Sequence, residues 1–232
     1  MLKKVLIANR GEIAIRAIRA CNELGIKTVA IYTKADQYAL HVKRASEAYC
    51  IGNEPVEPYL NIPRIIDIAK ASKCDGIHPG YGFLSENANF ARACDKAGIT
   101  FIGPSADVIE KMGSKIQARK AMIDAGIPVI PGSDGELQSL HEALETADAL
   151  GYPVVLKATY GGGGRGIRLC HNESELKLAY PRVISEAEKA FGNGSLFMEK
   201  FIGSPKHIEV QILADHFGNV IHLFERDCSI QR

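Results

Sequence analysis

The chain has 232 residues, of which 46% are apolar and 24% charged, enough to bury one or two hydrophobic cores. Its 28 basic and 27 acidic side chains give a formal net charge of +1. A near-neutral chain lacks the broad positive field that drives non-specific binding to phosphate backbones, so we expect no nucleic-acid partner.

The cysteines and the apolar residues are distributed as in a protein of a reducing, aqueous compartment. The six cysteines are scattered and form no CxxC pair, which is typical of buried thiols and not of a disulfide framework or a zinc site. The apolar run after Met1 is far too short for the core of a signal peptide, and no other stretch is long enough to span a bilayer. We therefore expect a cytoplasmic protein without membrane contact.

The first half of the chain alternates short β-branched runs with helical patterns. Predicted strands lie at 5–8, 27–32, 48–51, 76–78 and 99–102, and predicted helices at 14–24, 62–71 and 86–97. Gly25 is well placed to end the first helix. Strands that alternate with helices predict an α/β fold whose parallel sheet is covered on both faces.

The pattern changes after residue 102. Two helices in succession are predicted at 105–112 and 114–125, and the turn-rich segment 127–135 is the best candidate for a domain boundary. A helix at 137–150, strands at 152–157, 167–170 and 196–202, and a long helical stretch that we expect to break at Pro181 follow it. These elements predict a small α+β unit.

The last segment reads as a hairpin of two strands, at 207–214 and 220–224. Its alternation predicts that Ile208, Val210 and Ile212 point inward from a half-buried strand. A two-stranded hairpin is marginal alone, so we expect its sheet partners to come from sequence outside this chain.

The glycine-rich segment 157–166, KATYGGGGRG, is the sharpest local motif. It contains a G-x-G-x-x-G match but precedes a predicted strand and not a helix, which excludes a dinucleotide fingerprint, and there is no P-loop motif. Backbone amides free of Cβ atoms, beside the cation of Lys157, favour binding of phosphate. A mobile surface loop is the alternative interpretation.

Two further segments follow predicted strands, where parallel sheets carry their ligand crevice. The turn at 78–86 offers His78, Tyr81 and Glu86 as a site, although a structural turn with Glu86 in the first turn of a helix explains it equally well. The segment Asn-Arg-Gly-Glu at 9–12 fits best as a helix start with an acidic residue at the positive end of the dipole.

Two weaker candidates remain. Lys115 lies near the start of its predicted helix, where a cation is unfavourable unless it faces an anion, but a solvated lysine is the usual case. His207, Glu209 and Glu225 have the donor atoms for a metal site, and the outer face of a hairpin explains them as well. No residues have the spacing of a Ser-His-Asp or Cys-His nucleophile system.

Several motifs, taken together, resemble successive motifs of biotin carboxylase, an enzyme of the ATP-grasp superfamily. They lie at 7–14, 78–86, 157–166, 198–200 and 225–232. The resemblance runs from the first residue to the last, in order and without evident gaps, which makes it very specific.

The resemblance implies four parts: a Rossmann-like pre-ATP-grasp domain, a helical linker, the small α+β ATP-grasp lid, and an incomplete start of the carboxy-terminal ATP-grasp domain. The boundaries that we predict for these parts are 1–113, 114–130, 131–203 and 204–232.

It also implies that ATP and bicarbonate form carboxyphosphate, which then carboxylates a ureido nitrogen of biotin. The expected cofactors are ATP with Mg²⁺ or Mn²⁺, and biotin serves as a carrier-bound substrate. The expected partners are a biotin carboxyl carrier protein, a carboxyltransferase and a second copy of the enzyme. Acetyl-CoA, propionyl-CoA and pyruvate carboxylases share this component, so the acyl acceptor stays open.

The resemblance carries over to particular residues. Tyr81 matches a position beside the biotin pocket, and Arg16, Arg19 and Glu23 match positions of the homodimer contact. The positions that match the ATP site are Lys115, Lys157, Gly161, Gly162, Gly163, Gly164, Glu199, Lys200, Ile202, His207 and Gln231.

The family's metal-binding glutamates, bicarbonate-binding arginine and catalytic base are expected beyond Arg232. We therefore expect the 232-residue chain to be inactive by itself. The alternatives are a non-catalytic nucleotide-binding or assembly module, and another ATP-grasp ligase related to carbamoyl phosphate synthetase.

Overall fold

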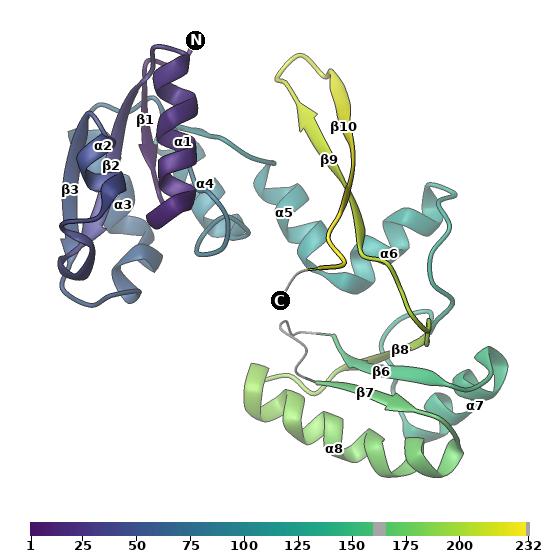
Figure 1. The fold of residues 1–232 in the computed structure, drawn as a ribbon. Coiled ribbons are helices and arrows are strands. Elements are labelled where there is room, and N and C mark those ends of the chain that lie inside the picture. The colour runs from purple at the N-terminus through teal and green to yellow at the C-terminus, as the bar shows by residue number, and fades with distance from the viewer. Residues whose placement is uncertain (160–165, 231–232) are drawn as a thin grey trace. The chain divides into compact units, whose positions relative to one another are not determined.

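The computed structural model of the protein describes residues 1–159 and 166–230. The chain divides into two compact units, Met1–Ala121 and Met122–Arg232 (Figure 1). Each unit is described by itself. The finer division into four parts, drawn from the sequence, stays a prediction.

A five-stranded parallel sheet forms the centre of the first unit, in the order β3-β2-β1-β4-β5. The strands are β1 (Lys4–Ile7), β2 (Lys27–Thr33), β3 (Glu47–Gly52), β4 (Gly76–His78) and β5 (Thr100–Phe101). The connections between them contain helices, as the alternating pattern predicts, so the predicted α/β class and parallel sheet are confirmed.

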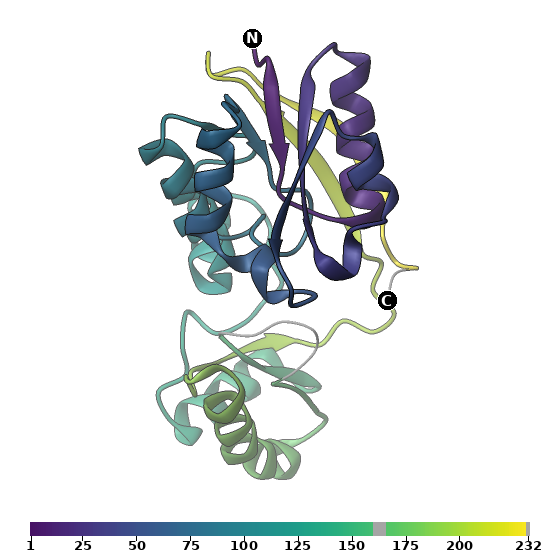
Figure 2. The ribbon, with the colours of Figure 1, turned by 90° about the vertical axis from the view of Figure 1, so that its left-hand side faces the viewer.

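Helices cover both faces of this sheet (Figures 1 and 2). In β1, Val5 packs against one apolar cluster and Leu6 against another, because consecutive side chains of a strand point to opposite faces. The helices are α1 (Gly11–Glu23) and α2 (Leu40–Arg44) on the first face, α3 (Ile62–Ala71) and α4 (Ala88–Lys96) on the second, and α5 (Ala106–Gly113) beside α4. Two 3-10 turns, Lys34–Asp36 and Glu57–Leu60, complete the unit.

Side-chain caps fix where several of these helices begin. The side chains of Asn61, Asn87 and Ser105 each accept a hydrogen bond from the backbone N–H three residues later. Because Asn87 is the cap of α4, Glu86 lies ahead of the helix, and its predicted place in the first turn is wrong. Gly25 follows α1 with a φ of 71°, as its predicted role requires.

The second unit carries a three-stranded antiparallel sheet in the order β7-β6-β8. Two helices pack on the sheet and share one apolar core with it. The elements are α6 (Lys115–Asp124), within which the two units meet in sequence, α7 (Leu140–Leu150), β6 (Val154–Ala158), β7 (Ile167–Cys170), α8 (Glu173–Phe191) and β8 (Leu196–Lys200). This is the small α+β unit predicted from the sequence.

Pro181 does not break α8, contrary to the prediction from the sequence. The helix continues from Glu173 to Phe191 with the proline inside it. Leu176, Tyr180 and Val183 lie on its buried side and belong to the core of the unit. The burial of that apolar stripe therefore outweighs the hydrogen bond that the proline removes.

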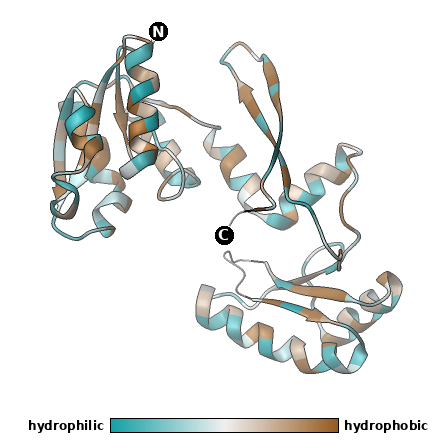
Figure 3. Ribbon diagram, in the orientation of Figure 1, coloured by the Kyte–Doolittle hydropathy of each residue, from teal (hydrophilic) through white to brown (hydrophobic). Residues whose placement is uncertain are grey.

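The last elements, β9 (Ile208–Ala214) and β10 (Val220–Asp227), form an antiparallel hairpin. Apolar residues recur along both strands (Figure 3). Ile208, Val210 and Ile212 are exposed, so the expectation of a half-buried strand is wrong for the described residues. A two-stranded hairpin has no second layer of its own to cover either face.

Within residues 1–159 and 166–230, no helix has the length and apolar character that crossing a membrane requires.

Candidate functional site

Lys157 lies near the carboxyl end of β6, on the face of the sheet opposite the helices. Its neighbours in sequence, Leu156 and Ala158, are buried in the apolar core, so alternation turns Lys157 to the other face. Its ammonium group forms an ion pair with Glu199 of β8 and lies 6.0 Å from the centre of the Phe197 ring. The two charged side chains are 28% and 16% exposed, which leaves part of the lysine within reach of a ligand.

The glycine loop that follows Lys157 lies outside the described residues, and so do the predicted positions Gly161, Gly162, Gly163, Gly164 and Gln231. The strands on either side of the loop are described. The backbone N–H of Ala158 donates to the carbonyl of Gly166 at 2.8 Å, so β6 and β7 are already paired where the loop leaves them. The loop therefore connects the ends of a hairpin that carries Lys157, as the motif predicts.

The segment after Glu199 is held against the rest of the second unit by its backbone and by one side chain. The backbone N–H of Lys200 donates to Pro131 at 2.8 Å. Its ammonium group donates to the carbonyls of Gly151 and Tyr152, at 2.8 and 3.1 Å. The ammonium group of Lys200 is thus engaged within this turn, and its role in nucleotide binding stays a prediction. Ile202, at 46% exposed, lies at the surface.

Lys115 and His207 belong to different parts of the chain. Lys115 is the first residue of α6 and is exposed. His207 lies just before β9, where its backbone N–H donates to Ser229 Oγ at 3.0 Å and its carbonyl accepts from Cys228 at 2.7 Å. Lys115 falls in the first unit and Lys157 in the second, so each is described in its own unit.

The metal-ligand interpretation of the hairpin gains no support. Glu209 forms an ion pair with Arg226 of the neighbouring strand, which accounts for its carboxylate. Among the described residues, no three His, Cys, Asp or Glu side chains are grouped so that they could hold a metal ion. The expectation that metal ligands lie beyond Arg232 stays a prediction.

The turn after β4 brings Tyr81 to the surface and engages His78 locally. His78 Nδ1 accepts a hydrogen bond from the backbone N–H of Gly80 at 3.0 Å, and burial lowers the pKa of its imidazole. The Tyr81 side chain is 59% exposed, and Glu86 is exposed as well. Of the three predicted residues, Tyr81 and Glu86 are thus accessible to a ligand, whereas His78 holds the turn.

Sequence reasoning considered the segment 9–12 and preferred a helix start, so it gave no role to Asn9, which follows β1 and is 1% exposed. Its Nδ2 donates to the carbonyls of Pro79 at 2.9 Å and Tyr81 at 2.8 Å. The prediction of a helix start for this segment is correct as far as it goes, since Glu12 lies in the first turn of α1. The available signal was that β1 and β4 are parallel and end side by side.

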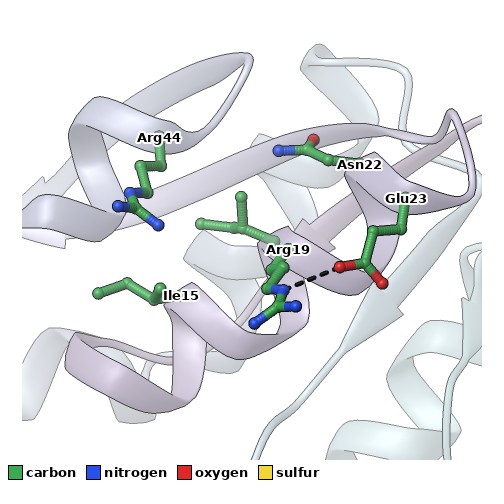
Figure 4. A pocket seen from close by; sticks show the side chains of 6 residues that line it. Ile15, Arg19, Asn22, Glu23 and Arg44 are labelled. Carbon is green, nitrogen blue, oxygen red and sulfur yellow. Dashed lines mark hydrogen bonds and ion pairs between the residues drawn. The ribbon is translucent and has the colours of Figure 1, made fainter.

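The predicted dimer-contact residues lie on the outer side of α1. Arg16 is exposed, and Arg19 Nε donates to Glu23 Oε1 at 2.8 Å (Figure 4). Arg19 and Glu23 line a pocket of about 300 Å³ between α1 and α2. The pocket is lined by Ile15, Ile18, Arg19, Asn22, Glu23 and Arg44.

Comparison with known proteins assigns the two parts of the chain to two domain families. Residues 1–109 match the biotin carboxylase N-terminal domain, and residues 114–232 match the ATP-binding domain of the carbamoyl-phosphate synthase L chain. The fold and the lysine-bearing sheet thus define an ATP-binding protein of the ATP-grasp class.

Relatives similar over the whole chain narrow the class. The sequence is 59% identical to biotin carboxylase of Halalkalibacterium halodurans and 59% identical to mitochondrial pyruvate carboxylase of Homo sapiens. The crystal structure of the biotin carboxylase domain dimer of Hydrogenobacter thermophilus 2-oxoglutarate carboxylase, in complex with MgADP, ADP and bicarbonate, matches with a TM-score of 0.92 at 59% identity. The chain belongs to the biotin carboxylase family.

The chain spans only part of these relatives. All of it is matched in each case, but it covers 52% of the bacterial biotin carboxylase, 20% of the human pyruvate carboxylase and 51% of the 2-oxoglutarate carboxylase domain.

Proposed function

We propose that this chain provides the amino-terminal domain and part of the ATP-grasp machinery of an enzyme that carboxylates biotin with ATP and bicarbonate. The observation that carries the proposal is the position of Lys157. It lies shortly before the glycine run in sequence and on the sheet face away from the core. It pairs with Glu199, lies over the ring of Phe197 and stays 28% exposed. A cation so placed can meet the phosphates of a nucleotide.

The chemistry requires positioning and charge neutralisation more than covalent help. A bicarbonate oxygen attacks the γ-phosphorus of ATP, ADP leaves, and carboxyphosphate forms. The ureido nitrogen of biotin then forms a bond to the carboxyl carbon, phosphate departs, and the nitrogen loses its proton. Lysines that neutralise the phosphoryl oxygens stabilise the first transition state. A lid that excludes water protects carboxyphosphate from hydrolysis.

The proposed contacts follow the family resemblance and the geometry of each unit. Lys115 and Lys157 bind phosphate oxygens, and Tyr81 borders biotin. The other residues that we propose for nucleotide binding are Gly161, Gly162, Gly163, Gly164, Glu199, Lys200, Ile202, His207 and Gln231.

The related 2-oxoglutarate carboxylase domain binds MgADP, as the name of that complex states. The described part of the present chain offers no acidic cluster that fits such an ion. We therefore derive no step through a metal and place the ligands for Mg²⁺ or Mn²⁺ in the part of the enzyme that this chain does not span.

We propose a biotin carboxyl carrier protein or domain and a carboxyltransferase as partners, because biotin must be delivered to and removed from the site. The related 2-oxoglutarate carboxylase domain is a dimer, and the exposed Arg16, Arg19 and Glu23 of α1 would supply part of the same contact here.

The relatives serve different acceptors, so the acceptor is a property of another domain. The unpaired cysteines suit a reducing location, which we propose is the cytoplasm.

The test is biotin-dependent ATP hydrolysis in the presence of bicarbonate and Mg²⁺. We expect it in the chain extended through the full length of its bacterial relatives and not in the 232-residue chain alone. Activity of the short chain would show that residues before Arg232 hold the metal and bicarbonate.

The match of residues 114–232 to a carbamoyl-phosphate synthase domain supports a second candidate, an ATP-grasp ligase with another acceptor. The match of residues 1–109 to the biotin carboxylase N-terminal domain favours the first. ATP hydrolysis by the extended chain that is indifferent to biotin would favour the second.

A further inference from the structure

The turn after β4 is fixed by the side chain of Asn9, which lies two residues after the end of the neighbouring strand β1. Ala8 donates its backbone N–H to His78 at 2.9 Å, which ends the pairing of β1 with β4. One residue later, Asn9 directs both protons of its side-chain amide at the turn, to Pro79 at 2.9 Å and to Tyr81 at 2.8 Å. Its Oδ1 accepts from the backbone N–H of Arg10 at 2.9 Å. The buried amide therefore has all its strong hydrogen bonds within the turn and its own backbone.

The turn runs so close to Asn9 that its own sequence is restricted. Gly80 has a φ of 68°, and a Cβ atom there would lie 2.6 Å from Asn9 Nδ2 and 2.8 Å from a side-chain carbon of Ile13. Both distances are shorter than real Cβ contacts. Only glycine at position 80 therefore lets the Asn9 amide approach the carbonyls of Pro79 and Tyr81. The position of this backbone depends on Asn9 and Gly80 together.

A second contact fixes the far end of the turn. Phe83, with a φ of 43°, stacks on the buried ring of Tyr59, with centroids 5.1 Å apart and planes inclined by 3°. The Tyr59 hydroxyl donates to Asp36 at 2.8 Å, and Asp36 forms an ion pair with Arg10. Between these two anchors, the side chain of Tyr81 is 59% exposed.

We propose that Asn9 is a positioning residue for Tyr81 and thereby for the binding of biotin. This inference rests on the proposed function, in which Tyr81 borders biotin. Asn9 sets the carbonyl of Tyr81 without occupying the exposed side of the residue. An amide suits this task because one nitrogen carries two donors, whereas an aspartate at the same place would present only acceptors to two carbonyls.

The experiment uses the full-length enzyme that carries this sequence, assayed by ATP hydrolysis with biotin, ATP and bicarbonate varied in turn. We expect Asn9→Ala to lower kcat/KM for biotin about tenfold or more, since displacing a contact group by about 1 Å is enough for such a loss. The KM for ATP should stay within about twofold, because the hydrogen bonds of the Asn9 side chain go to Pro79, Tyr81 and Arg10, none of which is proposed for nucleotide binding. Asn9→Ser keeps one hydrogen-bond donor, so its kcat/KM for biotin should lie between that of Asn9→Ala and that of the unsubstituted enzyme.

Asn87→Ala is the matched control. Asn87 also lies in the first unit, and its side chain accepts a backbone hydrogen bond from Phe90 at 3.0 Å, but that bond caps α4 and involves neither Pro79 nor Tyr81. It should lower the thermal stability of the enzyme and leave kcat/KM for biotin unchanged. An equal loss of kcat/KM for biotin in the control would overturn the role of Asn9, because it would reflect destabilisation of the unit.

A double-mutant cycle with Tyr81→Ala separates positioning from other effects. If Asn9 acts through Tyr81, Asn9→Ala should add little to the loss already caused by Tyr81→Ala. Fully additive losses would overturn the inference. A normal kcat/KM for biotin in folded Asn9→Ala and Asn9→Ser enzymes would overturn it as well. In both cases, biotin-dependent turnover of the unsubstituted enzyme would still uphold the proposed function. Absence of that turnover in the unsubstituted enzyme would overturn both.

Discussion

Lys157 and Glu199 are joined diagonally across the small antiparallel sheet. Lys157 of β6 is paired directly with Phe197 of β8, and Glu199 is two residues further along the same strand and on the same face. The ion pair between them is partly buried. A nucleotide phosphate that binds Lys157 must share the ammonium group with Glu199 or displace that carboxylate, so the pair links the stability of the second unit to its proposed ligand.

We predict that Lys157→Met lowers the affinity of the full-length enzyme for ATP about tenfold or more, a change of about 1.4 kcal/mol in binding free energy. The substitution removes the cation and keeps most of the apolar stem. It also leaves Glu199 without its partner in a partly buried place, which should lower the free energy of unfolding by about 1 kcal/mol. Calorimetric titration with ATP and thermal unfolding measure the two effects.

The double variant Lys157→Met/Glu199→Gln serves as the control. Replacing the carboxylate by a neutral amide removes the unpaired charge, so the stability should return towards that of the unsubstituted enzyme. The affinity for ATP should stay low, because the cation is still absent. Recovery of ATP binding along with stability would contradict a direct contact between Lys157 and phosphate.

We predict that the first unit loses stability as the pH falls through about 6.5. Burial lowers the pKa of both His41 and His78, so the unfolded chain takes up protons in this range that the folded chain does not. The stabilisation is present above the unfolded pKa and is lost as the pH falls towards the folded pKa. Hydrogen-exchange protection factors of β1 and β4, which correct for intrinsic exchange, should decrease between about pH 7.5 and 5.5.

His78→Asn isolates the contribution of one histidine. Asparagine can keep an acceptor for the N–H of Gly80 and cannot titrate, so the pH dependence should become shallower without disappearing, because His41 remains. His216→Asn, at an exposed position of the hairpin turn in the other unit, should leave it unchanged. A slope that His78→Asn does not alter would show that His78 gains its proton in the folded state as readily as in the unfolded one.

The sequence alone predicted most of the elements because their signals are local. The strand at 76–78 and the helix at 62–71 have the predicted bounds, since β-branched runs and helical periodicity are read within a few residues. The five-residue helix α2 was missed because it is too short to show a period. Pro181 misled the prediction because the core contacts of α8, which are tertiary, outweigh a local preference.

Of the candidate site, the sequence indicated only the local part. The glycine run made Lys157 a candidate phosphate ligand from adjacent residues, and that role stays a prediction. Its pairing with Glu199 depends on the register of β6 and β8, 42 positions apart in the chain, and no local pattern encodes that register. Asn9 was missed for the same reason, since its two carbonyl partners lie 70 and 72 positions away.

Pro181 provides a prediction about stability. Its ring is exposed on α8, so its replacement removes no core contact. We predict that Pro181→Ala raises the free energy of unfolding of the second unit by about 1–3 kcal/mol, because the helix regains a backbone donor and loses a steric clash. Denaturant unfolding measures it. Ser185→Ala, in the same helix, should add only about 0.5 kcal/mol, and an equal gain from both would point to helix propensity alone.

The outer side of α1 gives the last prediction, on self-association of the full-length enzyme. Reversing one charge in Arg19→Glu places two carboxylates one helical turn apart, with Glu23, and presents the wrong sign to a second copy. We expect sedimentation to show a dimer dissociation constant raised by about tenfold or more, with the fold intact because both side chains are exposed. The control is Arg64→Glu, on the exposed side of α3. Equal weakening by both variants would mean that net charge, and not this surface of α1, governs association.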